Sequence, residues 1–307
     1  MRLPLLSLGL LLVVAGCGES PGLRFTTGDA ATGDNDAVVM DGAAVEPDVA
    51  ATPLDVGTIP IRDNGAVATE ALVYAHSDTT LYTVNPRDNR FARVADFTFP
   101  RGTTAADMTD IAVDSEGAIT GTAGDAVWRI DARSAACTRV VTLPERRFFV
   151  GLSWVPRGTV DANSEVLVGA TTDGTLWRID VGSGRATQLF TLPRASGAAW
   201  TISGDLVSID GDATYITLRR EGAASTANDA LGVVDFRNRT LRIVGTDVGF
   251  ARVFGVGYWR QTLYGFTRTG EFITINTRTG VGRRVSTPTM QFSGAGVTTI
   301  ASIEAPP

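Results

Sequence analysis

One stretch recurs along this chain and limits what the chain can fold into. Its clearest copy runs from Leu176 to Thr191 and reads as an alternating strand, a turn that Asp180 opens, and a second strand. Four other copies place an Asp or Asn at the same point, so the five turn-opening positions are Asn85, Asp131, Asp180, Asp235 and Asn276. The intervals between them are 46, 49, 55 and 41 residues. This period indicates the blades of a propeller and not the helical pairs of a solenoid.

Each repeat should contain four short antiparallel strands, because alternating apolar segments are separated by turns rich in Gly, Asp, Asn and Ser. The second repeat shows them in order at 109–113, 118–122, 126–130 and 138–143. The first repeat has only three such segments, whereas one extra inner-type strand follows the last repeat at 294–300. We therefore predict an all-β, five-bladed β-propeller over residues 67–303, with N- and C-terminal strands completing one blade together. A sixth blade fits only if part of 40–66 is ordered.

The N-terminus has the pattern of a secretory leader. Arg2 supplies a positive charge, and residues 3–14 form an apolar run that is too short to span a bilayer as a helix. The run ends in Val14-Ala15-Gly16-Cys17, which resembles the lipobox of bacterial lipoproteins. The resemblance implies a signal peptide over 1–16, cleavage before Cys17, and attachment of diacylglyceryl and acyl chains (such as palmitate) at its thiol. An ordinary signal peptide that happens to contain a Cys is the alternative.

The segment that follows, residues 17–66, is predicted to be a disordered tether. It is rich in Gly, Ala and Asp and carries nine acidic residues against two arginines. Such a composition cannot bury enough apolar surface to offset the entropy of ordering. As a flexible chain it would hold the folded domain roughly 40 Å from a membrane. Gly18, where an Asp would retain a lipoprotein in the inner membrane, favours the outer membrane of a bacterial cell envelope as the destination.

Bulk charge and composition exclude some partners and leave few residues for catalysis. The formal net charge of −6 argues against nucleic acid, and all 27 basic residues are scattered arginines. The single histidine, His76, is expected in the loop after a strand at 72–75 and to be a surface or packing residue. Cys137 is expected to be a buried small residue. No catalytic residues are assigned, because a Ser-His-Asp site could be built only around His76.

The sharpest site prediction concerns the starts of the inner strands, which usually line the mouth of a propeller channel. Five positions align there: Asp110, Gly151, Asp205, Gly255 and Gly294. Two carboxylates among three glycines could bind Ca²⁺ with the help of backbone carbonyls and water. Alternatively, Asp110 and Asp205 accept hydrogen bonds from backbone amides of adjacent blades. No other cofactor is predicted.

The repeated Leu-Trp/Tyr-x-Ile/Val-Asp/Asn-x-x-Ser/Thr-Gly pattern, with inner segments such as 110–117, resembles the NHL, YVTN and gluconolactonase-like propellers. The resemblance covers about residues 70–301 and implies the architecture more than the function. Gluconolactonase-like propellers carry a metal in the channel, although the Glu and Asn ligands of their pattern are not found here.

Three functions are consistent with these observations. The leading one is a lipid-anchored, non-catalytic binding or scaffolding module of the cell envelope, with an envelope protein or a glycan as partner. The second is a calcium-dependent hydrolase or lyase with Asp110 and Asp205 at the channel. The third is a small-ligand or glycan sensor that uses the inserted loop at 219–228.

Overall fold

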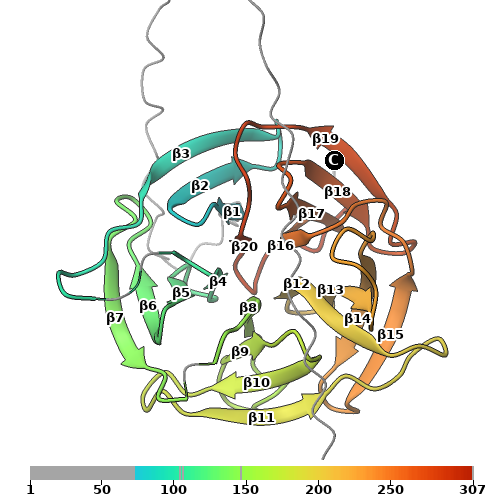
Figure 1. The fold of residues 1–307 in the computed structure, drawn as a ribbon, viewed down its shortest axis with the longest axis horizontal. Coiled ribbons are helices and arrows are strands. Elements are labelled where there is room, and N and C mark those ends of the chain that lie inside the picture. Colours follow the sequence, from blue (N-terminus) through green and yellow to red (C-terminus); the bar gives the residue numbers. More distant parts are fainter. Residues whose placement is uncertain (1–72, 104, 106, 146, 306–307) are drawn as a thin grey trace, which may run out of the picture. The chain divides into compact units, whose positions relative to one another are not determined.

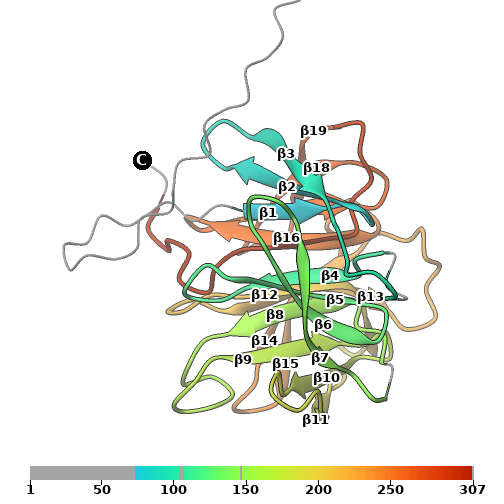
Figure 2. The same ribbon diagram turned by 90° about the vertical axis from the view of Figure 1, so that its left-hand side faces the viewer.

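A computed structural model describes residues 73–305 except 104, 106 and 146. In this part of the chain, the strands form five four-stranded antiparallel sheets arranged in a ring (Figure 1). The strands β4, β8, β12, β16 and β20 surround the centre of the ring, and each sheet extends outward from one of them. Figure 2 shows the ring from the side, with blade one at the top and blade three below. The predicted five-bladed propeller is therefore confirmed.

The bounds of the strands, from the innermost to the outermost of each blade, are as follows. Blade one contains β20 (Gly294–Gly296), β1 (Val73–His76), β2 (Thr80–Asn85) and β3 (Arg90–Asp96). Blade two contains β4 (Asp110–Val113), β5 (Ile119–Ala123), β6 (Ala126–Ile130) and β7 (Cys137–Thr142). Blade three contains β8 (Gly151–Val155), β9 (Val166–Ala170), β10 (Thr175–Ile179) and β11 (Ala186–Thr191). Blade four contains β12 (Trp200–Ser208), β13 (Thr214–Arg220), β14 (Ala230–Asp235) and β15 (Thr240–Gly245). Blade five contains β16 (Val253–Trp259), β17 (Thr262–Thr267), β18 (Phe272–Asn276) and β19 (Gly282–Ser286).

The repeated Asp or Asn makes the turn between the third and fourth strands of its blade. Asp180 shows how: its Oδ1 accepts hydrogen bonds from the amides of Gly182 at 2.8 Å and Ser183 at 3.2 Å. The residue four positions after the turn-opening residue has a positive φ in every blade, and Gly184 occupies this position in blade three. The recurring sequence pattern is therefore a recurring local hydrogen-bond pattern, which explains why it could be recognised without the fold.

The outermost strand of each blade is a sheet edge. In all five blades the pairing between the third and fourth strands contains a register shift at the same relative position. A bulge there bends and twists the edge, which makes pairing with another chain less favourable.

The ring closes where the two ends of the described chain meet. β20 pairs antiparallel with β1, with Ala295 opposite Ala75, so the C-terminal strand supplies the inner strand of the first blade as predicted. Phe292, which precedes β20, is fully buried. The centroid of its ring lies 5.2 Å from that of Phe266 in blade five and 5.6 Å from that of Phe91 in blade one. This aromatic contact joins the last blade to the first.

Beyond β20 the chain crosses one face of the ring. The Thr298 hydroxyl donates to the carbonyl of Asp114 in blade two at 2.8 Å, and the amide of Asp210 in blade four donates to Thr299 at 2.7 Å. The amide of Arg260 in blade five donates to Ser302 at 2.8 Å. The Thr299 hydroxyl also donates to Glu165 in blade three, so the tail contacts four blades on this face.

Two sequence expectations need correction. His76 is the last residue of β1, not part of the loop that follows, because it pairs with Leu81 in the sheet. The segment at 294–300 is a strand only as far as Gly296, since the chain then turns across the face of the ring. The predicted signal peptide (1–16) and tether (17–66) lie outside the described residues. Within 73–305, no helix has the length and apolarity needed to cross a membrane.

Candidate functional site

The two aspartates predicted at the channel do lie at the axis, and both are fully buried. Asp110 accepts hydrogen bonds from the amide of Ile111 at 2.9 Å and from that of Leu152 in the next blade at 2.7 Å. Asp205 likewise accepts from its own neighbour, Leu206, at 2.6 Å, and from Val256 in the next blade at 2.8 Å. The alternative raised by the sequence, that these carboxylates hold backbone amides of adjacent blades, is therefore confirmed.

The surrounding glycines exist because the inner strands approach one another closely. Around the ring the aligned position reads Gly294, Asp110, Gly151, Asp205 and Gly255. A Cβ on Gly294 would collide with the Asp110 carboxylate. Glycine and aspartate alternate around the ring, but the number of blades is odd. At one point, between blades five and one, two glycines (Gly255 and Gly294) are therefore next to each other. There a Cβ on Gly255 would lie 2.6 Å from the carbonyl carbon of Gly294. The axis is thus closely packed.

Burial makes ionisation of the axial carboxyls unfavourable. Loss of solvation raises the pKa of Asp205 to about 8. The pKa of Asp110 is raised well above its ordinary range by burial first and by the nearby Asp205 charge second. Two carboxyls in one desolvated site cannot easily both be charged. The pair therefore retains a proton at neutral pH.

His76 lies beside this pair and is fully buried. Its Nδ1 donates a hydrogen bond to the carbonyl of Ser77 at 2.8 Å, so in the neutral ring Nε2 carries no proton. Nε2 lies 3.7 Å from Oδ1 of Asp110 and has no hydrogen-bond partner among the described residues. Burial lowers the pKa of His76 to about 4. It is a neutral packing residue, and no serine hydroxyl contacts its free nitrogen in the described part of the chain.

The oxygen atoms at the axis do not suit the coordination of calcium. Calcium takes six to eight oxygen ligands, but each of the four carboxylate oxygens of Asp110 and Asp205 already accepts an amide hydrogen bond. Among the described residues, no group of three or more His, Cys, Asp or Glu comes together to hold a metal ion. Calcium binding at these two residues stays a prediction, and it would have to displace hydrogen bonds that hold the blades together.

A third aspartate, Asp229, is also fully buried and was not predicted from the sequence. Asp229 accepts from the Ser203 hydroxyl at 2.5 Å and from the amide of Val253 in blade five at 2.7 Å. Burial raises its pKa to about 6. Asp229 follows the inserted loop. Asp125 stands at the same point of the second repeat, but the other three repeats have Thr79, Gly174 and Gly270 there, so the position is not part of the periodic pattern. After Asp205, Asp229 is the second buried carboxyl that links blades four and five.

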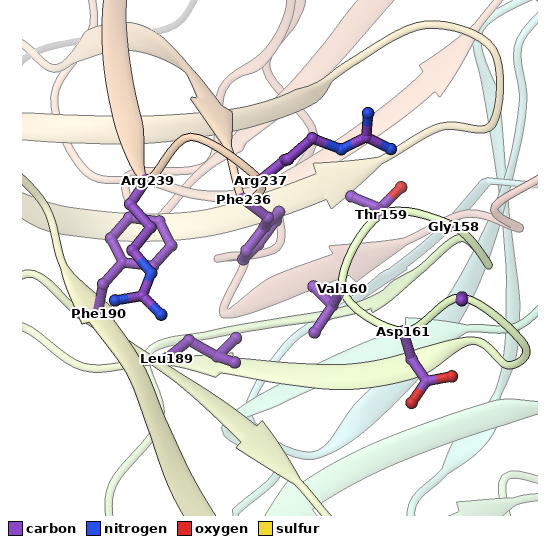
Figure 3. A pocket seen from close by; sticks show the side chains of 10 residues that line it. Gly158, Thr159, Val160, Asp161, Leu189, Phe190, Phe236, Arg237 and Arg239 are labelled. Carbon is purple, nitrogen blue, oxygen red and sulfur yellow. The ribbon is translucent and has the colours of Figure 1, made fainter.

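A cleft of about 500 Å³, which was not predicted from the sequence, lies on the rim between blades three and four (Figure 3). Three segments line it: the loop at 158–162, the end of β11, and the turn at 236–239. Figure 3 shows Phe236 in the middle, with the side chains of Arg237 and Arg239 on either side of it. One signal was present in the sequence, because Arg239 stands where two other copies of the turn have Gly184 and Gly280.

The fold and these sites define a five-bladed β-propeller with a closed axis and a cleft on its rim. No protein-family model matches the sequence, and no curated protein is significantly similar to it. The likeness to the NHL, YVTN and gluconolactonase-like groups therefore extends only as far as the propeller arrangement.

Proposed function

We propose that this protein is a non-catalytic binding or scaffolding module, anchored by lipid at Cys17 in a bacterial cell envelope, with the outer membrane as the favoured site. One observation carries the non-catalytic part. The axial side chains that could do chemistry are fully buried and hydrogen-bonded to the ring's own backbone, whereas the rim has an accessible cleft. A rigid ring suits the presentation of a surface to an envelope protein or a glycan.

The lipobox pattern and the acidic spacer support the anchored location. Two or more acyl chains would make membrane attachment stable, since each buried methylene contributes about 0.8 kcal/mol. The acidic charge of the spacer would keep it away from anionic lipid headgroups.

The test uses the full-length chain in bacterial cells, with Cys17→Ser as the matched variant. We expect an alkyne analogue of palmitate to label the native chain and not the variant, and only the native chain to fractionate with the outer membrane. Photo-crosslinking residues placed at the exposed positions 148, 162 and 281 should give a discrete adduct from at least one site. Unlabelled native protein would disprove the anchor, and the absence of any adduct would disprove the binding function.

The calcium-dependent hydrolase or lyase remains the second candidate. It is favoured by one observation, which is that Asp110 and Asp205 lie together at the axis. Calcium titration of the full-length protein, followed by its melting temperature, separates the two candidates. We expect no change; a rise in melting temperature that Asp110→Asn abolishes would favour the enzyme.

A further inference from the structure

The rim cleft has an apolar floor. Phe190, from β11, and Phe236, from the turn after β14, are each less than one-tenth exposed, and their rings meet edge to face with centroids 5.9 Å apart. Leu189 and Val160 are half-buried at its sides. Because the floor comes from two blades and a long connection, its shape depends on the packing of the ring and is rigid. An apolar side chain placed there would lose water on most of its surface.

The rim of the cleft is cationic. Arg237 and Arg239 are exposed, and within the described residues neither takes part in an ion pair or a side-chain hydrogen bond. The carboxylate on the cleft, Asp161, is already paired with Arg178 at 3.3 Å. The pKa of Asp235 is lowered first by hydrogen bonds that its oxygens accept from Asn238, and only last by the charge of Arg237. Of the two arginines on the cleft, Arg239 is the one for which the described residues supply no carboxylate.

Arg239 is also held in a strained conformation. Its φ is +53°, in the left-handed region that glycine tolerates best. Gly184 and Gly280 occupy the same turn position in blades three and five, with φ of +73° and +72°. A residue with a long side chain at such a position costs on the order of 1 kcal/mol. Asn89 and Ala135 occupy this position in blades one and two with φ of +60° and +53°, so a positive φ is common to the turn. What distinguishes blade four is a long cationic side chain there, at the edge of a cleft.

We propose that this cleft binds an extended acidic peptide segment of a partner protein. A carboxylate of the peptide pairs with the fork of Arg239, and a neighbouring apolar side chain lies on Phe190 and Phe236. Guanidinium groups bind carboxylates through two parallel hydrogen bonds, and a combination of Arg with buried aromatic residues is typical of interface hot spots. The charge of the cleft selects an acidic segment over a neutral one. This inference rests on the proposed binding function and specifies its ligand.

Arg237 and Arg239 can be told apart by comparison with the other blades. An arginine also occupies the position of Arg237 in blades one, two and five (Arg87, Arg133 and Arg278), so an arginine there is a general feature of the turn. Arg239 has no such counterpart among the five copies. Arg239→Gly therefore removes the special cation and relieves the backbone strain at the same time, and Arg133→Ala is the matched control on another blade.

The test pans the full-length protein in detergent against a random nine-residue peptide library displayed on phage. We expect the enriched peptides to carry Asp or Glu next to an apolar residue. In fluorescence anisotropy, Arg239→Gly should weaken the binding of an enriched peptide at least tenfold, and Arg133→Ala should leave it unchanged. The melting temperature of Arg239→Gly should equal or exceed that of the native chain, which excludes misfolding as the cause.

Three outcomes would overturn this inference: no enrichment, enriched peptides that lack acidic residues, or equal binding by Arg239→Gly. Crosslinking in cells distinguishes failure of the peptide-binding cleft from failure of the proposed binding function. If Arg239→Gly still gives the adduct of the native chain, the protein binds its partner by another surface. If the native chain gives no adduct, the binding function itself is wrong.

Discussion

The amide of Leu152 donates a 2.7 Å hydrogen bond to the carboxylate of Asp110 in the preceding blade. Asp205 repeats this arrangement with Val256 at 2.8 Å. A buried carboxyl at the axis thus links blade two to blade three, and a second one links blade four to blade five. The same two residues that suggest a metal site in the sequence act as links between blades in the structure.

The close packing at the axis predicts a large effect for a very small substitution. Gly294→Ala would place a methyl group against the Asp110 carboxylate and the His76 ring. We expect it to lower the free energy of unfolding by about 1–3 kcal/mol, as overpacking of a core does. Gly182→Ala is the control, because its nearest neighbour would be Asp180 Oδ1 at 3.2 Å on an exposed turn. Urea unfolding should show a change within about 0.5 kcal/mol for the control. Equal effects of the two substitutions would contradict the closed axis.

Stability should fall between pH 6.5 and 8. The pKa of Asp205 rises from about 4 in the unfolded chain to about 8 in the folded one. Between these values the folded state binds more protons, so stability decreases as pH rises, by up to about 1.4 kcal/mol per pH unit for one group. His76, with a folded pKa of about 4, acts in the opposite direction between pH 4 and 6.5. Asp229, with a folded pKa of about 6, destabilises the fold as pH rises from 4 to 6 and so roughly offsets the contribution of His76.

Above pH 6.5 the axial pair, Asp110 and Asp205, therefore dominates the pH dependence of stability. A substitution of Asp205 should remove part of this dependence. Melting temperatures measured from pH 6.5 to 8 should decrease for the native chain. They should decrease less for Asp205→Asn, which cannot ionise. A slope that the substitution leaves unchanged would mean that the axial pair does not control it.

Closure of the ring should depend on one aromatic side chain. Phe292 is fully buried between blades one and five, and Phe292→Ala should cost about 3–5 kcal/mol. Phe148 is the matched control because 69% of it is exposed. Phe148→Ala should leave stability within about 0.5 kcal/mol of the native value. The two melting temperatures, measured side by side, check this; a similar loss for both would mean that the blade contact contributes little.

Counting thiols tests the lipid anchor independently of any labelling in cells. Cys137 is buried, and burial raises the pKa of its thiol to about 12. The folded protein should therefore react very slowly with iodoacetamide at pH 8, because the thiolate is the reactive form. After denaturation, one thiol per chain should react if Cys17 carries a lipid. Two reactive thiols would show that it does not.

Much of the fold could be predicted from the sequence because its signals are local. The turn at Asp180 depends on contacts with residues two and three positions later, and strand alternation depends on a period of two. The missing strand of the first repeat and the extra strand at the end together predicted the shared blade. These features need no knowledge of which distant segments meet.

What the sequence by itself determined is therefore the all-β class, the five repeats and the alignment of two aspartates with three glycines. The tertiary structure decided what those residues do. Asp110 and Leu152 are 42 positions apart and meet only once the ring closes. The rim cleft likewise joins the loop at 158–162 to the turn at 236–239. Burial and contact between distant segments follow from the geometry of the closed ring, and a linear pattern does not record that geometry.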